Sequence, residues 1–430
     1  MDIKLAGKQM YRLTEELFPI CRSITGDGVR QTLKIIKKHL HELNIYEIPT
    51  GEQCFDWTIP QEWNIKNAYI EDEEGKKIVD FNENNLHIVN YSIPVNKKLN
   101  LEELSKHLYS LPEQPDAIPY VTSYYNEAWG FCISENQRKN LNEGVYTVNI
   151  DSSLEDGGMT YADLLIKGKT DKEILISTYT CHPSMANNET SGPVLATFLA
   201  KWILNLTNRY YSYRIIFVPE TIGAVAYLSK NLDEMKAKTI AGFVLTCVGD
   251  DRSYSYMPSR SGDLLADKVA LHVLNKKIKK YKEYSFLDRG SDERQYCAPG
   301  VDLPVCSIMR SKYGEYPEYH TSLDNLNLVS SDGFQGSFDA HIDMLKILES
   351  NNKYMATCLG EPQLGKRNLR QTSGAGKGLA PNFLNISHFL AYADGNLDLI
   401  DIANILDIYA LDLLPIVNKL LENDLIKSVD

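Results

Sequence analysis

The sequence predicts an α/β protein in which a mostly parallel sheet carries a small β-rich insertion and is followed by a compact helical module. Three observations support this prediction. Apolar strand-like runs alternate with helical patterns across residues 145–355, which is typical of a parallel sheet covered on both faces. Short strand-like segments separated by turns and prolines fill residues 51–144. Three short helical patterns follow a glycine-rich stretch near the end of the sequence.

The composition is that of an ordinary soluble protein. The chain has 430 residues, 43% hydrophobic and 24% charged, which allows two or three domains of about 100–200 residues each. Its net charge of −12 repels phosphate backbones, so we expect no nucleic-acid partner. We expect no membrane segment, because no apolar run approaches the roughly 20 residues of a spanning helix. Eight cysteines without a CxxC pair predict no disulfide framework and a cytoplasmic location.

Residues 1–50 are expected to open the main domain with two helices around the turn Thr25-Gly26-Asp27-Gly28. This turn lacks the lysine and the preceding strand of a phosphate-binding loop. The insertion at 51–144 is rich in aromatic residues. The ordinary interpretation places these rings in packing, and a sharper one places some of them over a substrate pocket.

Six strands and four helices are expected in the alternating region. The strands are Val145–Ile150, Tyr161–Ile166, Glu173–Thr178, Tyr213–Val218, Gly242–Thr246 and Leu303–Met309, and the helices are Ser191–Asn205, Gly223–Asn231, Asp263–Lys279 and Gly333–Glu349. In open α/β sheets the functional site lies beyond the carboxyl ends of the strands. His182 and Glu220 both follow such ends, so we expect them at one edge of the sheet.

The last module, residues 360–430, begins with a glycine-rich linker at 361–381. Three helices and a terminal strand predict a winged-helix-like fold, with helices at Phe383–Ala393, Leu397–Leu406 and Leu411–Glu422. From residue 382 onward the sequence holds eight acidic residues and two lysines. The module therefore carries a net negative charge, which repels the phosphate backbone of a nucleic acid. We therefore expect the module to serve protein packing or a homo-oligomer.

Two histidines and a glutamate follow strand-like runs or lie in a polar loop: His182, Glu220 and His320. Such groups can form a hydrolytic zinc site. Each residue also has an ordinary structural explanation: the histidines can be held by hydrogen bonds, and the glutamate can form a salt bridge. The acidic pair Asp292 and Glu293 beside Arg294 likewise matches a solvated charge cluster.

Together, the order of these elements resembles the zinc aminopeptidase superfamily, which includes bacterial leucyl aminopeptidase and glutamate carboxypeptidase. A closer resemblance, over nearly the whole chain, is to a bacterial aminopeptidase-like group long labelled a domain of unknown function and associated with surface-polysaccharide gene clusters. The segments that carry it are Arg22–Gly28, Phe55–Pro60, Glu62–Ile65, Cys181–Ser184, Pro219–Gly223 and Pro317–Asn325. The resemblance implies a discontinuous peptidase domain (1–50 and 145–355), an inserted protease-associated-like subdomain (51–144) and a winged-helix tail.

The sequence departs from the superfamily pattern at Asn188, where the resemblance implies a carboxylate that bridges two metals. A neutral amide cannot bridge two dications, so we expect one zinc ion, with two ions or weak binding as alternatives. The neighbouring Glu189 has a longer side chain and a shifted position, which leaves its role open. The resemblance also implies a pair of glutamates, of which this sequence has Glu220 alone. It further implies a metal-binding carboxylate near the end of the strand at Gly242–Thr246, where Asp250 and Asp251 come a few residues late.

The sequence thus predicts a zinc-dependent aminopeptidase-like hydrolase acting on a small peptide, aminoacyl or amide substrate. The expected metal ligands are His182, Asn188 and His320, with Glu220 as base or ligand. Further metal or substrate contacts are expected from Glu189, Asp292 and Glu293, and oxyanion contacts from Tyr319 or Arg294. Two alternatives remain open: an amidase or deacylase of surface-polysaccharide metabolism, and a decayed binding or scaffold protein.

Overall fold

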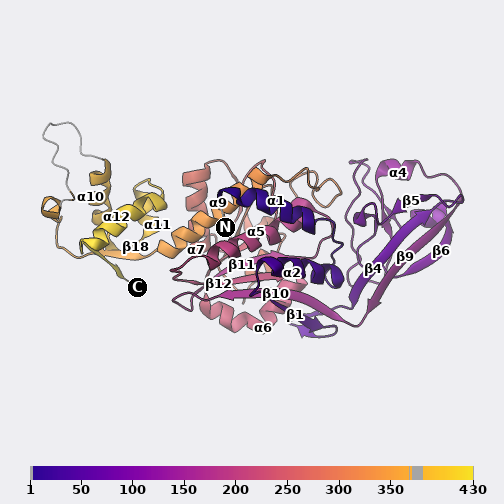
Figure 1. The fold of residues 1–430 in the computed structure, drawn as a ribbon, viewed down its shortest axis with the longest axis horizontal. Coiled ribbons are helices and arrows are strands. Elements are labelled where there is room, and N and C mark those ends of the chain that lie inside the picture. The colour runs from indigo at the N-terminus through magenta and orange to yellow at the C-terminus, as the bar shows by residue number, and fades with distance from the viewer. Residues whose placement is uncertain (1–2, 368, 370–380, 430) are drawn as a thin grey trace. The chain divides into compact units, whose positions relative to one another are not determined.

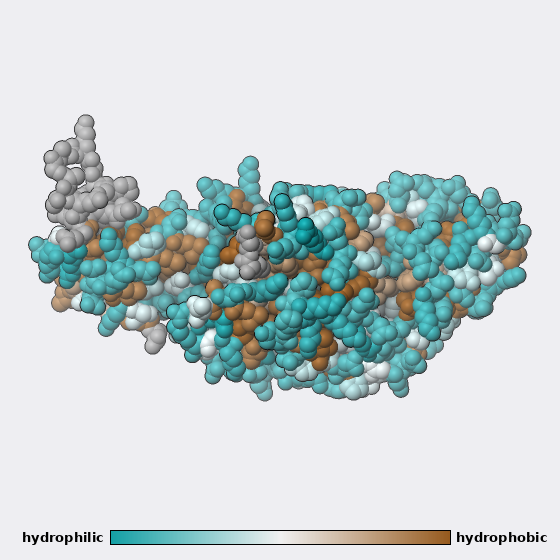
Figure 2. Space-filling view, viewed as in Figure 1, coloured by the Kyte–Doolittle hydropathy of each residue, from teal (hydrophilic) through white to brown (hydrophobic). Residues whose placement is uncertain are grey.

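The computed structural model describes residues 3–367, 369 and 381–429. These residues form two compact units. The first joins the residues up to 266 with 282–338, and the second joins 267–281 with the residues from 339 onward. Hydrophilic side chains predominate on the face shown in Figure 2, and no helix of the described residues is long and apolar enough to cross a membrane.

An eight-stranded sheet forms the centre of the first unit, in the order β1-β10-β12-β11-β13-β16-β14-β15. The bounds are β1 (Asn44–Pro49), β10 (Gly158–Ile166), β11 (Glu173–Tyr179), β12 (Ser212–Val218), β13 (Thr239–Leu245), β14 (Ser255–Met257), β15 (Lys282–Glu283) and β16 (Val305–Met309). The central strands β12, β11, β13 and β16 are parallel. Every residue of β11 and β12 is buried, as expected for strands covered on both faces.

Helices cover the two faces of this sheet (Figure 1). One layer holds α1 (Ala6–Leu17), α2 (Asp27–His39) and α5 (Ser191–Leu204), and the other holds α6 (Ile222–Lys238) with α8 (Glu293–Tyr296). Helix α7 (Leu265–Val273) precedes a π-helical turn at Leu274–Ile278, and α9 spans Ser331–Ser350. The predicted α/β fold is therefore confirmed.

The insertion and the strand that follows it form a second, four-stranded sheet in the order β5-β4-β9-β6. Its strands are β4 (Glu62–Glu71), β5 (Lys77–Asp80), β6 (Val95–Asn100) and β9 (Val145–Glu155), and its smaller elements are β2 (Gln53–Cys54), β3 (Trp57–Thr58), α3 (Leu101–Ser105), β7 (Leu108–Tyr109), β8 (Phe131–Cys132) and α4 (Glu135–Lys139). Residues 145–150 thus pair with β4 and β6. Our assignment of this strand to the main sheet was wrong, because its partners lie far upstream.

Among the described residues from 351 onward, the second unit forms three α-helices and a three-stranded antiparallel sheet. The helices are α10 (Pro381–Tyr392), α11 (Leu399–Ile405) and α12 (Ala410–Glu422), and the strands are β17 (Lys353–Ala356), β18 (Asp394–Asp398) and β19 (Ile426–Val429). Strand β17 pairs with both β18 and β19, so this sheet begins before the expected boundary at residue 360. Most of the glycine-rich linker, at 368 and 370–380, lies outside the described residues.

Candidate active site

The structure brings the two predicted histidines and the glutamate together at the carboxyl edge of the parallel strands. His182 follows β11 and Glu220 follows β12, while His320 comes from the loop between β16 and α9. The ring centroids of His182 and His320 lie 5.4 Å apart. The Nε2 atom of His182 lies 3.6 Å from a carboxylate oxygen of Glu220, whose side chain is 20% exposed.

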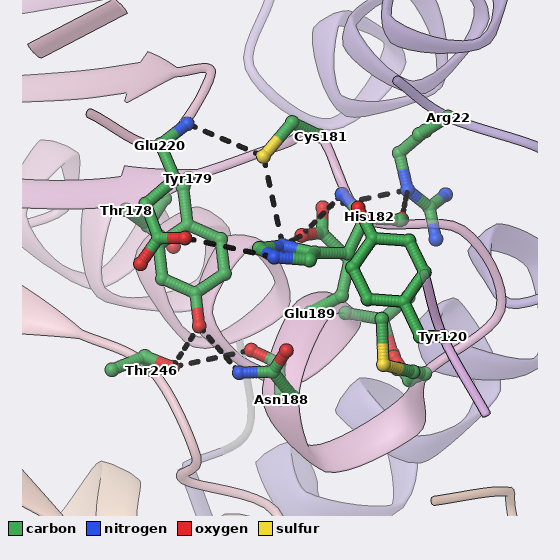
Figure 3. Close-up of polar contacts among 12 residues, drawn as sticks. Arg22, Tyr120, Thr178, Tyr179, Cys181, His182, Asn188, Glu189, Glu220 and Thr246 are labelled. Atoms are coloured by element: carbon green, nitrogen blue, oxygen red, sulfur yellow. Dashed lines mark hydrogen bonds and ion pairs between the residues drawn. The ribbon is translucent and has the colours of Figure 1, made fainter. Parts of the chain in front are cut away.

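The ring of His182 is fixed by the buried pair Arg22 and Glu189 (Figure 3). One Glu189 oxygen accepts the backbone N–H of His182 at 2.9 Å and lies 3.0 Å from its Nδ1. The Nε of Arg22 lies 3.4 Å from the other Glu189 oxygen and donates to the His182 carbonyl at 2.8 Å. The hydrogen bond to Glu189 places a proton on Nδ1; burial lowers the pKa of His182, but that bond and the charge of Glu220 outweigh it, so the pKa is raised. Nε2 is therefore directed toward Glu220, an arrangement common among metal-binding histidines.

His320 presents an open nitrogen beside this ring. Its imidazole stacks on Tyr319 with centroids 3.9 Å apart and meets the edge of Tyr120 at 5.2 Å. Its Nε2 atom is buried and has no hydrogen-bond partner among the described residues. Burial, and then the charge of His182, lower the pKa of His320 to about 3. The ring is thus neutral and has the protonation state of a metal ligand.

The insertion contributes to the site directly. Its Tyr120 packs against both imidazoles and shares a 2.8 Å hydrogen bond with the Tyr124 hydroxyl. The backbone N–H of Tyr120 donates to the His320 carbonyl at 2.8 Å, and Pro119 forms an isolated bridge with Thr321. The loop that carries His320 is therefore positioned by the insertion.

Asn188 lies at the margin of this arrangement. Its amide nitrogen donates to the Tyr179 hydroxyl at 2.6 Å, and that hydroxyl also lies 2.5 Å from Thr246 Oγ1. Its Oδ1 atom is buried without a hydrogen-bond partner. Thr246 follows the end of β13, where the resemblance implied a carboxylate. Asp250 instead accepts from Asn187 and from the backbone N–H of Ser311, so it serves loop structure.

The remaining acidic residues separate into two environments. Glu293 accepts the backbone N–H groups of Gly290 and Ser291 and the Tyr313 hydroxyl through Oε1, and its buried Oε2 has no hydrogen-bond partner among the described residues. Asp292 accepts the Thr221 N–H at 2.7 Å through Oδ1, while its buried Oδ2 has no hydrogen-bond partner in the described part of the chain.

Burial raises the pKa values of the Glu220 and Asp292 carboxyl groups. For Glu220, the positive charges of His182 and Arg294 offset part of that rise. For Asp292, the charge of Glu220 adds to it, and the pKa stands well above its ordinary value. The two groups together thus favour holding a proton. Arg294 donates to Thr221 Oγ1, which turns it toward the loop after β12.

Two family models match the chain. The family described as a domain of unknown function, DUF4910, matches residues 11–351. The chain belongs to this family. A winged helix-turn-helix model matches residues 352–428, and the winged-helix module predicted from the sequence is confirmed.

This DUF4910 chain is 46% identical over 400 residues to a Clostridium acetobutylicum protein, with 92% of the chain and 91% of that protein covered. That protein's name provisionally describes a polysaccharide biosynthesis protein with an aminopeptidase-like domain. A crystal structure from the same organism, provisionally titled a peptidase, matches with a TM-score of 0.93 and 43% identity over 99% of this chain and 98% of that one. The zinc aminopeptidase BSAP of Bacillus subtilis matches with a TM-score of 0.57 and 12% identity over 80% and 94%. That likeness shows a shared fold.

Sequence reasoning missed the groups that orient the site. Arg22 is fully buried, and its only signal in the sequence was its place in the segment Arg22–Gly28, far from His182 along the chain. Tyr120 gave no signal beyond the aromatic content of the insertion. Cys181 lies with His182 and Glu189 in a cluster whose ligand atoms are within 4.8 Å of one another.

The Cys181 thiol and the Glu189 carboxylate both lie on the Nδ1 side of His182. Burial, followed by the charges of Glu189 and Glu220, raises the pKa of the Cys181 thiol well above its ordinary value, and a protonated thiol is a poor ligand. Glu189 already occupies Nδ1. On the other side of the ring, His182 Nε2 lies 3.6 Å from a Glu220 oxygen, and the nearby His320 keeps an unpartnered Nε2 among the described residues.

Proposed function

We propose that this protein is a zinc-dependent aminopeptidase-like hydrolase that cleaves an N-terminal amino acid or a related amide. The observation that carries the proposal is the pair of imidazoles 5.4 Å apart, one with an unpartnered buried Nε2, beside a carboxylate 3.6 Å away. Two histidines and a carboxylate hold the catalytic zinc of several hydrolases. We propose one ion, held by His182 and His320, with Glu220 as third ligand or as base.

Zinc bound here would supply an acidified water and a polarised substrate carbonyl. As base, Glu220 would take a proton from the attacking water while the water oxygen bonds to the carbonyl carbon. It would return that proton to the amide nitrogen as the carbon–nitrogen bond breaks, so that the amine leaves neutral. Burial raises the pKa of Glu220, which brings this carboxyl group nearer to the working pH of a general base.

Neighbouring side chains would bind the substrate. Burial raises the pKa of Tyr319, so its hydroxyl stays protonated and able to donate to a developing oxyanion. The unpartnered Oδ2 of Asp292 would accept a substrate amino group. Glu189 would orient His182, and Asn188 would have a marginal part. Glu293 and Arg294 are engaged elsewhere and would support the loops.

Metal analysis and an activity screen test this function together. The native protein should contain about one zinc ion per chain and hydrolyse at least one member of an aminoacyl-p-nitroanilide panel, and His182→Ala and His320→Ala should each lose both properties. Glu220→Gln separates the two roles of Glu220, because a base variant keeps the metal and a ligand variant loses it. A native chain that takes up no zinc on titration would refute the proposal.

A second candidate is an amidase or deacylase that acts on an N-acyl or aminoacyl saccharide. The name of the 46% identical relative, which refers to polysaccharide biosynthesis, favours it. N-acetylated sugars and aminoacyl reporters, compared on the same preparation, would separate the two. A third candidate, a decayed binding or scaffold protein, follows from the amide at Asn188. It predicts a metal-free chain that stays inactive with added zinc.

We also propose that the insertion is a protease-associated-like subdomain of a discontinuous peptidase domain, and that the protein acts in the cytoplasm. The acidic winged-helix module would support a homo-oligomer and bind no nucleic acid, because its eight acidic residues and two lysines from residue 382 onward repel phosphates.

A further inference from the structure

We propose that the first unit contains a second ligand site, a cavity of about 690 Å³, which binds a saccharide. The cavity is lined by the end of α1, the turn between α1 and α2, the start of β4 and the loop after β5. None of the residues His182, Glu220, Asp292 and His320 lines it. It is therefore distinct from the proposed hydrolytic site.

The wall of this cavity is held in place by close packing and hydrogen bonds. At Gly26, with φ +91°, an added Cβ would come within 2.0 Å of the Trp63 carbonyl oxygen. Thr25 Oγ1 accepts the Trp63 N–H at 2.9 Å, and Asn64 Oδ1 accepts the Asp27 N–H at 2.7 Å. The turn before α2 is thus locked against β4, and the proposed hydrolytic mechanism uses neither segment. Their close packing forms the cavity before any ligand arrives.

The lining has the chemistry of a neutral polyhydroxyl compound. It contains the carboxylates of Glu16, Asp27 and Glu83, several side-chain amides, and the half-buried rings of Phe18 and Phe81. Sugar hydroxyl groups both donate and accept, so they pair with carboxylates and amides, while ring C–H faces pack on apolar side chains. Lysine is represented once in the lining, by Lys66, so the excess negative charge disfavours phosphates and acidic sugars.

Two side chains of the lining are open to such a ligand. Gln31 on α2 and Glu83 in the loop after β5 are exposed, and neither side chain has a hydrogen bond within the described residues. Ser184 and Ser322, each two residues beyond an imidazole of the hydrolytic site, also line the cavity. Ser184 Oγ donates to the Phe18 carbonyl at 2.8 Å, and Ser322 Oγ accepts the Ile118 N–H at 3.0 Å. A saccharide held here would contact both histidine-bearing loops.

Saturation-transfer NMR and calorimetry on the full chain test this site with glucose, N-acetylglucosamine, glucuronate and glycylglycine as probes. At least one neutral sugar should bind with a millimolar Kd, and glucuronate should bind more weakly. Gln31→Trp, which fills the cavity, and Glu83→Ala should each raise that Kd at least roughly tenfold. Lys37→Trp places the same indole on an exposed face of α2 outside the lining and should leave the Kd unchanged.

The variant Glu220→Gln distinguishes this proposal from the hydrolytic one, because sugar binding should persist in it whether or not hydrolysis is observed. Absence of sugar binding, binding of glycylglycine alone, or sugar binding that Gln31→Trp does not weaken would each overturn the saccharide site. Circular dichroism and the urea midpoint of each variant establish that a loss of binding reflects the cavity and not unfolding.

Discussion

Replacing Glu189 by glutamine should destabilise the protein. The Glu189 carboxylate is 1% exposed and lies 3.4 Å from the fully buried guanidinium of Arg22. Glutamine keeps the volume of the side chain but removes its charge, so Arg22 stays buried without a counter-ion. Removing one partner of a buried ion pair costs about 3–5 kcal/mol. We expect the free energy of unfolding to fall by that amount.

The same substitution should weaken zinc binding through His182. The carboxylate now serves two donors of that residue, at 2.9 Å and 3.0 Å, and a glutamine carbonyl is a weaker acceptor whose amide group can also turn toward Nδ1. Loss of the outer partner of a metal-binding histidine typically costs about 10–100-fold in affinity. The Kd for zinc should therefore rise by that factor.

Urea unfolding measures the first effect, and competition with a chromophoric chelator measures the second. Glu102→Gln is the matched control, because Glu102 is 88% exposed and lies 4.0 Å from Lys106; its loss should cost under about 0.5 kcal/mol. The double variant Arg22→Met with Glu189→Gln removes both charges and should recover part of the lost stability. If Glu189→Gln unfolds at the native urea midpoint and binds zinc as tightly as the native chain, the network does not hold His182.

Three further outcomes are expected. The hydrogen bonds from Arg30 lower the pKa of Glu62 to about 2 from 4.5, so its contribution to stability is present above pH 4.5 and lost as the pH falls toward 2. In Glu62→Gln, the free energy of unfolding measured with urea should depend less on pH between 4.5 and about 2. An unchanged pH dependence would contradict the assignment to Glu62. Asn188→Asp adds a buried carboxylate that favours a cation, so zinc should bind at least roughly tenfold more tightly by chelator competition; unchanged affinity would place residue 188 outside the metal's reach. Tyr120→Phe should cost about 1 kcal/mol in urea through the hydroxyl shared with Tyr124. Tyr120→Ala should also weaken zinc binding, and retained affinity would show that the ring does not position the imidazoles.

The sequence predicted the main sheet and the approximate position of the site because both depend on local patterns. The apolar runs of β11 and β12 are buried along their whole length, and the residues just after them lie at the edge where parallel strands expose a site. His182 and Glu220 could therefore be placed without knowledge of the other strands. The loop with His320 had no such local signal, and the family resemblance supplied it.

Strand partners were harder to predict because pairing is not local. The run at β9 could be identified as a strand from its own residues, but its partners are β4 and β6 of the insertion. The short strand β17 lies directly after α9 and pairs with β18 and β19. The residues of a strand therefore do not determine which sheet it joins, because that choice depends on partners distant in sequence.

The side chains of Asn188 and Glu189 point in directions that their places in the sequence motif did not determine. Residues 186–190 form a π-helical turn, and successive residues of a helical turn project in different directions. Asn188 accordingly donates to Tyr179, while the longer Glu189 reaches back to Nδ1 of His182. The loop thus lacks a carboxylate at residue 188 but places one beside the imidazole, where it orients the ring. Arg22 balances that buried charge from the turn between α1 and α2, 167 residues before Glu189 (189 − 22), a pairing that only the folded chain reveals. In the proposed site, the amide at residue 188 would leave no carboxylate to bridge a second ion, while the Glu189 carboxylate holds the His182 ring that would bind the first.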